Sequence, residues 1–420
     1  MPTTISSTPV GDAERITSID VLRGFALLGI LVMNIQSFSM ISAAYMNPTA
    51  YGDLTGANWW VWAVSHVLTD QKMYGLFSML FGAGIVLMAS RAEGRGERSA
   101  RLHYRRMGWL LLFGLLHGHL LWYGDILYSY AMCGMLVFLF RRAQPKTLFI
   151  LAAVFYAIGS ALYLVSGWSM QFWPPEAITG FLDQGWRPPP AAVDEELAIY
   201  RGGWLTQMPH RITLSFFLQT LVFFMSVAWK TTANMLLGMA LFKTGVLTGG
   251  RPTAFYQRLM SIGFLAGLPL AILGIARNVA AGWDGRYSFF QGSQYNYWAA
   301  IIIDMGWIGL VILAMRSGAL AWLVQRLDAV GRMAFTNYIM QTLIATTLFY
   351  GHGFGLYGSV SRVGQVGIVL AVWTLQLIVS PSWLSRFQYG PLEWGWRSLT
   401  YGRRMPMRRA GLEQSGMLAS

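Results

Sequence analysis

The sequence is poor in charged residues: only 12% of its 420 residues are Asp, Glu, Lys or Arg, against about a quarter in a typical soluble domain. This scarcity argues against a soluble globular protein and favours a multi-pass helical membrane protein. A lone cysteine, Cys133, excludes an intramolecular disulfide. Metal-ligand spacings, P-loops, GxSxG and GxGxxG motifs are also absent. The sequence therefore predicts neither a metal site nor a standard nucleotide-binding loop.

Acidic residues are scarcer than basic ones, 18 against 31, which gives a net charge of +13. Basic residues collect in the cytoplasmic loops of membrane proteins, and no nucleic-acid motif is present, so we predict a lipid bilayer as partner and no nucleic acid. The polar N-terminus has no basic region followed by a cleavage site. The first apolar helix is therefore expected to act as an uncleaved anchor.

Apolar segments long enough to form spans dominate the chain. They lie at 19–41, 59–89, 107–124, 126–140, 147–167, 211–247, 259–276, 297–315, 333–350 and 364–384. The fold is expected to be all-α: a polytopic transmembrane helical bundle of about ten spans, because a helix satisfies its own backbone polar groups in lipid. No internal repeat is visible.

Loop charge orients this bundle. The arginines after the second, fourth and eighth segments and in the tail can all be cytoplasmic only if 211–247 crosses once. Ten spans with both termini in the cytoplasm follow; eleven, from two crossings at 211–247, is the alternative. The expected organisation is a tail over 1–18, the bundle over 19–384 and a basic juxtamembrane tail over 385–420.

The largest loop on the opposite side, 168–210, is rich in acids and prolines. It is expected either to cap a site or to be a solvated connector. The chain is thus predicted to be a multi-pass protein of a bacterial inner membrane, with a homo-oligomer left open.

Ionisable residues inside the third and fourth segments are the main candidates for a site, because charges in lipid are costly and mark function. His117 lies about 16 Å into its helix at about 1.5 Å per residue, and Asp125 lies at the following turn. An imidazole beside a carboxylate suits general-base chemistry. His119 points about 200° away from His117 on a helix, so the two should not share one site.

Polar residues of the first two segments are further candidates. Asp20 and Arg23 are spaced to pair on a helix, and Arg23 is placed to meet a phosphate from the cytoplasm. Asn34 is either a contact between helices or a substrate contact. Lys72 is either an interfacial, snorkelling lysine or a substrate-binding residue.

The remaining polar candidates lie in the C-terminal half. Asp304 is expected to pair with a neighbouring helix. Asn337, Tyr338 and Gln341 share one predicted face, where they line a polar channel or join helices. Glu393 and Arg397, spaced i and i+4, would stabilise a short interfacial helix.

Six motifs resemble, in order, those of the YeiB-like family of multi-pass bacterial inner-membrane proteins, a domain of unknown function. They are RITSIDVLRGFALLGILVMNI, KMYGLFSMLFGAG, GLLHGHLLWYGDILYSYAMCG, GMALFKTGVL, RMAFTNYIMQ and FQYGPLEWGWRSLTY. The family is distantly similar to transmembrane acyltransferases, which share mainly Asp20-x-x-Arg23-Gly24 and Asn34. By this resemblance His117 matches the family's third-span histidine and Asp125 the acid of its GDIL motif. The loop 42–58 lacks the histidine that some of those acyltransferases carry.

The resemblance implies a transfer of an acyl group from cytoplasmic acyl-CoA to a sugar or lipid-linked acceptor. Acyl-CoA would be a substrate, and no cofactor is firmly indicated. In this hypothesis His117 removes the acceptor's proton, and Asp125 or Lys72 orients it or stabilises charge. The alternative is a transporter or proton-coupled permease, in which Asp20, Asp125, Asp304, His117 and Lys72 would form a polar pathway.

Overall fold

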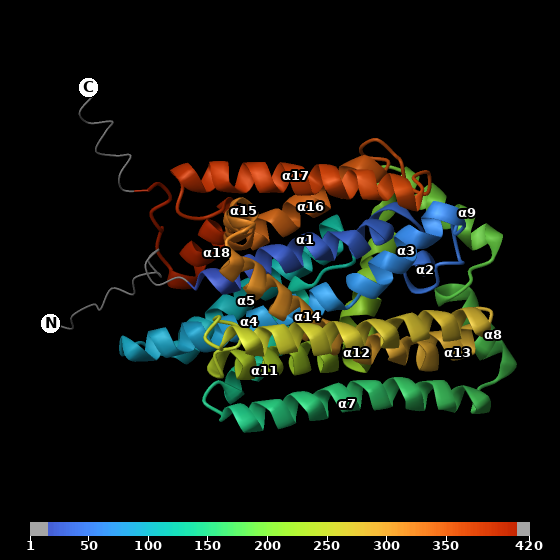
Figure 1. Cartoon of the computed structure of the whole chain (residues 1–420). Coiled ribbons are helices and arrows are strands. Elements are labelled where there is room, and N and C mark those ends of the chain that lie inside the picture. Colours follow the sequence, from blue (N-terminus) through green and yellow to red (C-terminus); the bar gives the residue numbers. More distant parts are fainter. Residues whose placement is uncertain (1–15, 410–420) are drawn as a thin grey trace.

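Helices form most of the chain in the computed structural model, which describes residues 16–409 (Figure 1). Seven of its helical segments are long and apolar enough to cross a membrane. They are Thr17–Ser39 (α1), Gly56–Leu68 with Lys72–Gly94 (α3 and α4), Pro145–Ser169 with Met170–Phe172 (α7 and η4), Trp204–Phe217, Leu218–Val227 and Ala228–Lys243 (α10, η5 and α11), Thr253–Ala280 (α12), Gly285–Tyr287, Ser288–Gly292 and Ser293–Ser317 (α13, η6 and α14), and Arg362–Arg386 (α17).

The other three predicted segments are also helical, but shorter or more charged. They form Ser99–Leu116 with His117–Leu121 (α5 and η2), Leu127–Val137 with Phe138–Phe140 (α6 and η3), and Ala334–Phe349 (α16). The all-α prediction is thus confirmed over the described residues, while the count of ten crossings stays a prediction. Residues 204–243 form one continuous helical segment with no loop inside it, as a single crossing requires.

The stretch 168–210, expected as a cap or a solvated connector, is largely helical. Beyond the end of α7 it contains Pro175–Gly185 (α8), Pro190–Arg201 (α9) and the first turns of α10. Proline opens both α8 and α9, a position where its missing N–H costs nothing. The remaining short helices are Ala43–Met46 (α2), Ala321–Arg332 (α15) and Pro391–Tyr401 (α18).

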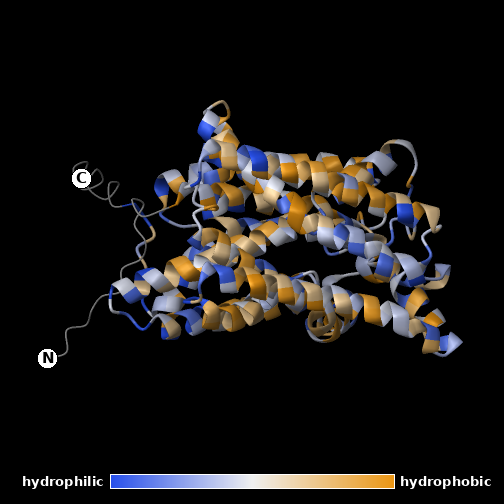
Figure 2. Ribbon diagram, turned by 60° about the horizontal axis from the view of Figure 1, so that its bottom comes forward, coloured by the Kyte–Doolittle hydropathy of each residue, from blue (hydrophilic) through white to orange (hydrophobic). Residues whose placement is uncertain are grey.

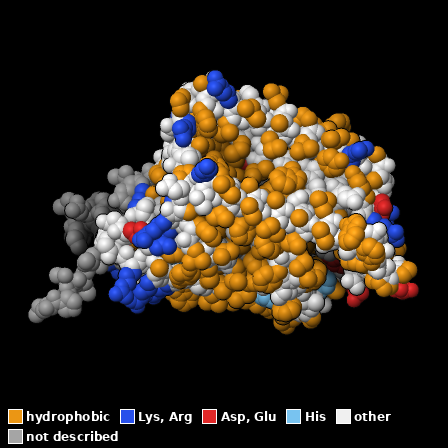
Figure 3. Space-filling view, turned by 90° about the horizontal axis from the view of Figure 1, so that it is seen from below, with side chains coloured by type: hydrophobic (Ala, Val, Ile, Leu, Met, Phe, Trp, Pro, Cys, Tyr) orange, Lys and Arg blue, Asp and Glu red, His pale blue; other side chains and the backbone are white. Residues whose placement is uncertain are grey.

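Several arginine-rich helix ends lie together at one end of the bundle, which we call the basic end. Arg141 and Arg142 pair with Glu93 at the end of α4, both at 3.2 Å. Lys243 at the end of α11 donates to the Ala143 carbonyl oxygen at 2.7 Å, and Ser18 of α1 donates to the Leu247 carbonyl oxygen at 2.8 Å. The start of α1 and α18 lie at this same end (Figure 1), and Lys and Arg gather there in Figure 3.

Helix α1 lies in the middle of the bundle, whereas α7, α12 and α17 lie at its periphery (Figure 1). The peripheral helices expose large apolar side chains, for example Leu265, which is 78% exposed, and Val165, which is 57% exposed. Apolar residues cover the length of the helices between the two ends in Figure 2. Such a surface is unfavourable in water and is what a lipid-facing surface requires.

Two glycines allow α4 and α11 to pack backbone against backbone. A Cβ at Gly82 would overlap the Met235 carbonyl, and a Cβ at Gly238 would overlap the Met79 carbonyl. Small residues at helix contacts are typical of membrane bundles, where close approach replaces the hydrophobic driving force.

Candidate functional site

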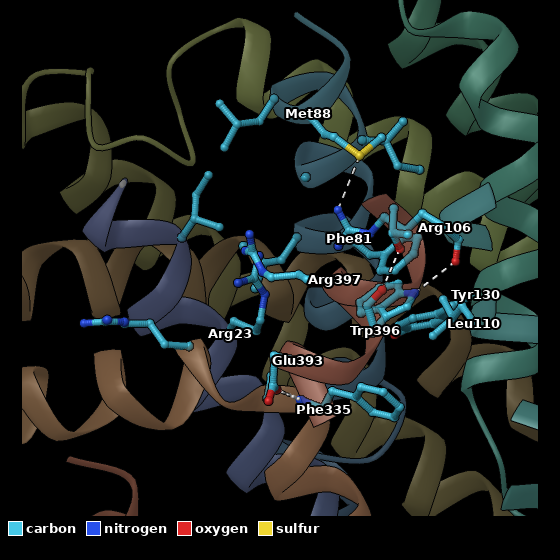
Figure 4. A pocket seen from close by; sticks show the side chains of 18 of the residues that line it. Arg23, Phe81, Met88, Arg106, Leu110, Tyr130, Phe335, Glu393, Trp396 and Arg397 are labelled. Atoms are coloured by element: carbon cyan, nitrogen blue, oxygen red, sulfur yellow. Dashed lines mark hydrogen bonds between the residues drawn. The ribbon is translucent and has the colours of Figure 1, made fainter. Parts of the chain in front are cut away.

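A cavity of about 270 Å³ enters the bundle from the basic end (Figure 4). Six arginines line it, five of them on different helices and one in the loop after α4: Arg23, Arg91, Arg95, Arg106, Arg332 and Arg397. Deeper in, its walls are apolar and aromatic: Phe77, Leu80, Phe81, Ile85, Leu110, Ile126, Leu127 and Tyr130. From Arg91 to Phe77 the lining follows α4 for about 21 Å at about 1.5 Å per residue. The cavity is therefore amphipathic along its length, cationic at the mouth and apolar inside.

Helix α18 closes one side of the cavity mouth. Trp396 donates from its indole N–H to the Arg106 carbonyl oxygen at 3.0 Å, and the Arg106 guanidinium lies 4.3 Å from the centre of the Trp396 ring. The Glu393 carboxylate accepts from the backbone N–H groups of Phe335 and Thr336, at 2.7 and 3.0 Å. Burial raises the pKa of Glu393, although these hydrogen bonds act in the opposite direction. The predicted short helix at Glu393 exists, and it is docked on α16.

The predicted pair of Asp20 and Arg23 is present at the mouth, with 2.7 Å between the carboxylate and the guanidinium. Arg397, the other basic residue singled out from the sequence, lies 4.7 Å from the centre of the Tyr389 ring. Both arginines line the cavity with Asp20 and Glu393. Six guanidinium groups against two carboxylates among the lining residues make this mouth favourable for an anion.

His117 and Asp125 form a buried pair beyond the apolar end of the cavity. His117 Nδ1 lies 2.8 Å from Asp125 Oδ1, and the two side chains are only 2% and 1% exposed. The second carboxylate oxygen accepts from the Tyr128 backbone N–H at 2.7 Å. On its other side the imidazole places Nε2 3.0 Å from the Thr342 hydroxyl. The arrangement is Asp–His–hydroxyl, with each group held by the next.

A local break in α5 shapes this pair. The helix continues as a π turn over His117–Leu121, closed by Trp122 N–H donating to the His117 carbonyl oxygen at 2.9 Å. Wide turns of this kind are frequent at functional sites. His119 leaves the turn on another side and contacts Gln219 Oε1 through Nε2 at 3.0 Å. The two histidines thus lie in different environments, as their spacing predicted.

Tyr338 separates the cavity from the His117 pair. Its side chain lines the cavity, and its ring centre lies 5.1 Å from that of His117. Its hydroxyl accepts from the Ile126 backbone N–H at 3.3 Å. A ligand in the cavity therefore lies against Tyr338, one residue layer from His117.

A second polar cluster lies on the far side of α4, between α3, α11 and α14. Asp70 accepts from Asn296 at 2.9 Å and lies 3.1 Å from His66 Nδ1. Lys72 is fully buried; it donates to the His66 carbonyl oxygen at 2.8 Å and to the Asn296 side chain. The interfacial, snorkelling interpretation of Lys72 is therefore wrong, because its ammonium is satisfied inside the bundle.

Asp304 and Lys230 complete this cluster. Asp304 is 1% exposed, and its Oδ1 has no hydrogen-bond partner among residues 16–409. Lys230 donates to Gln71 Oε1 and lies 4.7 Å from the centre of the Tyr297 ring. Lys230 and Lys72 are the cations that act on the Asp304 carboxylate. Asp304 does face a neighbouring helix, α4, where Gly75 lies against its carboxylate.

The three polar residues predicted on one face of α16 point in two directions, toward α17 and toward the cavity. Asn337 donates to Ser380 at 3.0 Å and Gln341 donates to Gln376 at 2.9 Å, both on α17, whereas Tyr338 faces the cavity. The shared-face prediction is wrong for Tyr338: neighbouring residues on a helix differ by about 100°. Asn34 is half-buried on α1 and does not line the described cavity.

Residues that the sequence did not single out complete both sites. Thr342 lies one helical turn after Tyr338, and that i+4 spacing was the available signal. Lys230 lies within the predicted apolar segment 211–247, and its charge there was the available signal. Arg106 was counted with the other loop arginines, although its stacking on Trp396 places it at the cavity.

The fold and these buried polar sites define a multi-pass helical membrane protein. Comparison with known proteins gives its family. The chain is 33% identical over 410 residues to "Uncharacterized protein YxaH" of Bacillus subtilis (strain 168), covering 92% of this chain and 94% of that protein. It is 32% identical over 396 residues to "Uncharacterized protein YeiB" of Escherichia coli (strain K12), covering 92% and 96%. The chain belongs to this YeiB-like family.

Two further matches are consistent with this family assignment. A family model described as "Protein of unknown function (DUF418)" matches residues 241–403. An uncharacterized 39.9 kDa protein of Bacillus acidopullulyticus is 27% identical over 408 residues, covering 95% of this chain and 97% of that protein. No solved structure matches the chain.

Proposed function

We propose that this protein is a membrane acyltransferase, which moves an acyl group from acyl-CoA to a sugar or lipid-linked acceptor. The observation that carries the proposal is the cavity, which leads from six arginines to Tyr338 against the His117–Asp125 pair. A CoA thioester has phosphates at one end and an acyl chain at the other. Arginine suits phosphate because its planar guanidinium donates two parallel hydrogen bonds, and the apolar walls suit the acyl chain.

In this proposal the basic end faces the cytoplasm of a bacterial cell, because basic residues are retained on that side of the inner membrane. The termini would then both be cytoplasmic. Helices α5, α6 and α16 would add three spans to the seven longer ones and give the predicted ten. Acyl-CoA would enter from the cytoplasm, and the acceptor would approach His117 from the other end.

The chemistry proposed for the pair is general-base catalysis. The Asp125 carboxylate accepts a hydrogen bond from His117 Nδ1–H, which leaves Nε2 of the neutral imidazole as the acceptor. Nε2 removes the proton from an acceptor hydroxyl or amine, whose oxygen or nitrogen attacks the thioester carbon. The C–S bond breaks, and the proton passes from His117 to the departing CoA thiolate.

The test is acyl transfer by purified protein in liposomes. Acyl-CoA carrying a labelled acyl group is added with a cell-envelope extract as acceptor, and labelled product is measured. Changing His117→Ala should lower transfer by about 10²–10⁴-fold, the usual contribution of a general base, while His119→Ala, the matched control two residues away, keeps most activity. Wild-type transfer by a correctly inserted His117→Ala protein would disprove the role.

One observation favours a transporter as the second candidate. Lys72, Lys230 and Asp304 are buried between helices, and polar clusters of this kind occur on ion and substrate pathways. Solute or proton flux into protein-containing liposomes without any acyl-CoA would support this candidate, provided that Asp304→Asn abolishes the flux.

A further inference from the structure

Thr342 presents its hydroxyl to His117 in the way that an activated nucleophile does. Its Oγ lies 3.0 Å from His117 Nε2, while Asp125 holds the opposite ring nitrogen at 2.8 Å. A hydroxyl, an imidazole and a carboxylate in this order form the arrangement that activates serine and threonine nucleophiles. The proposed function uses His117 and Asp125 but gives Thr342 no role.

The protons of this row can be assigned from its partners. A carboxylate only accepts, so His117 Nδ1 carries the proton between it and Asp125. In the neutral imidazole Nε2 then accepts, and the hydrogen of the Thr342 hydroxyl points toward it. The competing acceptor, the Tyr338 carbonyl oxygen, lies farther away at 3.4 Å. The Thr342 oxygen therefore has its proton already directed to the base.

The surroundings of Thr342 would protect an ester from hydrolysis. Thr342 is 1% exposed. The Trp122 ring, stacked on Phe38 with 4.0 Å between ring centres, lies 6.4 Å from the centre of the His117 ring. A site that excludes water stops a reactive acyl intermediate from being lost. Tyr338, one helical turn before Thr342, lines the cavity. Rotation of the Tyr338 ring would therefore open a path by which an acyl carbonyl reaches the Thr342 hydroxyl.

We propose that Thr342 is an acylation site: its Oγ takes the acyl group from the thioester before the acceptor does. The Thr342 Oγ–C bond forms and the thioester C–S bond breaks. The hydroxyl proton moves to His117 Nε2 and then to the CoA thiolate. In the second half, His117 takes the acceptor's proton, the acceptor attacks the Thr342 ester and the proton returns to Oγ. The inference rests on the proposed acyltransfer, and it replaces the direct attack of the acceptor on the thioester by two successive transfers through Thr342.

The experiment follows CoA release and protein labelling without any acceptor, with the whole chain in detergent and a labelled short-chain acyl-CoA as probe. The wild type should release at most one CoA per protein in a burst and carry the acyl group on the peptide containing Thr342, identified by mass spectrometry and removed by hydroxylamine. Thr342→Ser should keep the burst, and Thr342→Val should lose it. Thr346→Val is the matched control, because Thr346 is a similarly buried hydroxyl one turn further, bonded to the Thr342 carbonyl oxygen at 2.9 Å.

The outcomes separate the two proposals. Two outcomes would overturn the role of Thr342 and leave the proposed acyltransferase function standing. In the first, Thr342→Val transfers the acyl group to an added acceptor at the wild-type rate. In the second, the acyl group is found only on another residue. A wild type that consumes no acyl-CoA with or without the envelope extract would overturn both. A burst lost equally in Thr342→Val and Thr346→Val would show only a packing effect and would also reject the inference.

Discussion

Replacing Asp125 with asparagine should remove acyl transfer while leaving the shape of the site unchanged. The two carboxylate oxygens have different partners: Oδ1 faces His117 Nδ1 at 2.8 Å, and Oδ2 accepts from the Tyr128 backbone N–H at 2.7 Å. A backbone N–H can only donate, so in the Asp125→Asn variant the amide oxygen of the new side chain must face Tyr128. The amide NH₂ then faces His117 Nδ1 and forces that nitrogen to act as the acceptor.

The consequence is a change of tautomer in His117. The proton moves to Nε2, which becomes a donor toward Thr342 Oγ and can no longer take a proton from it. An Asp-to-Asn change that inverts a catalytic histidine in this way costs about 10⁴-fold in rate, and the loss of a general base costs about 10²–10⁴-fold. We therefore expect Asp125→Asn to lower acyl transfer by about 10²–10⁴-fold, or about 3–6 kcal/mol in activation free energy at about 1.4 kcal/mol per factor of ten.

The assay is release of CoA thiol in liposomes, with Asp53→Asn as the control, because Asp53 accepts two side-chain hydrogen bonds in an exposed loop away from the cavity. Size-exclusion behaviour and thermal unfolding in detergent establish that both variants fold. An Asp125→Asn protein that folds and transfers at the wild-type rate would refute the tautomer argument and, with it, the base assigned to His117.

Three other changes test the packing and electrostatics. Gly82→Ala should lower the free energy of unfolding by about 1–3 kcal/mol, because the added methyl overlaps α11. Gly84→Ala is the control and should not lower it, because the space around Gly84 is open. The denaturation midpoints of the two variants in detergent test this difference. Lys230→Met should cost about 3–5 kcal/mol by leaving Asp304 with less compensation, and adding Asp304→Asn should recover part of that loss in the same assay. Burial raises the pKa of Glu393, so the stability that the Glu393 carboxyl contributes is greatest below the ordinary carboxyl pKa and falls as pH rises through the raised value. The unfolding temperature should therefore differ more between about pH 5 and about pH 8 for the wild type than for Glu393→Gln. Equal differences in the two proteins would contradict this direction of the pH dependence.

The helices could be predicted from the sequence because lipid imposes a simple rule. A segment of bilayer length without charge has to satisfy its backbone internally, and each apolar segment read from the sequence is helical in the structure. The separation of His117 from His119 also followed from local geometry, because residues two apart on a helix cannot face the same way. These predictions use only neighbours along the chain.

Contacts between distant residues could not be predicted in this way. Thr342 is 225 positions from His117, and Asn296 is 224 positions from Lys72; no periodicity relates them. Lys72 illustrates the difficulty, because a lysine at a helix start is normally solvated at the interface. The Lys72 ammonium can be buried because α14 packs against α4 and brings the Asn296 side-chain amide within hydrogen-bond distance of it.

The cavity and the buried charge cluster are not independent, and this affects how any variant should be interpreted. Tyr130 lines the cavity and shares a hydrogen bond with Ser78 at 2.9 Å. Its hydroxyl also reaches the carbonyl oxygen of Tyr74, whose own hydroxyl bonds Thr231, the neighbour of Lys230. Because α4 contributes residues to both regions, we expect a change at Asp304 to alter acyl transfer through packing. Loss of transfer in Asp304→Asn therefore does not choose between the two functions, whereas flux that is lost in Asp304→Asn and kept in His117→Ala would identify a transporter.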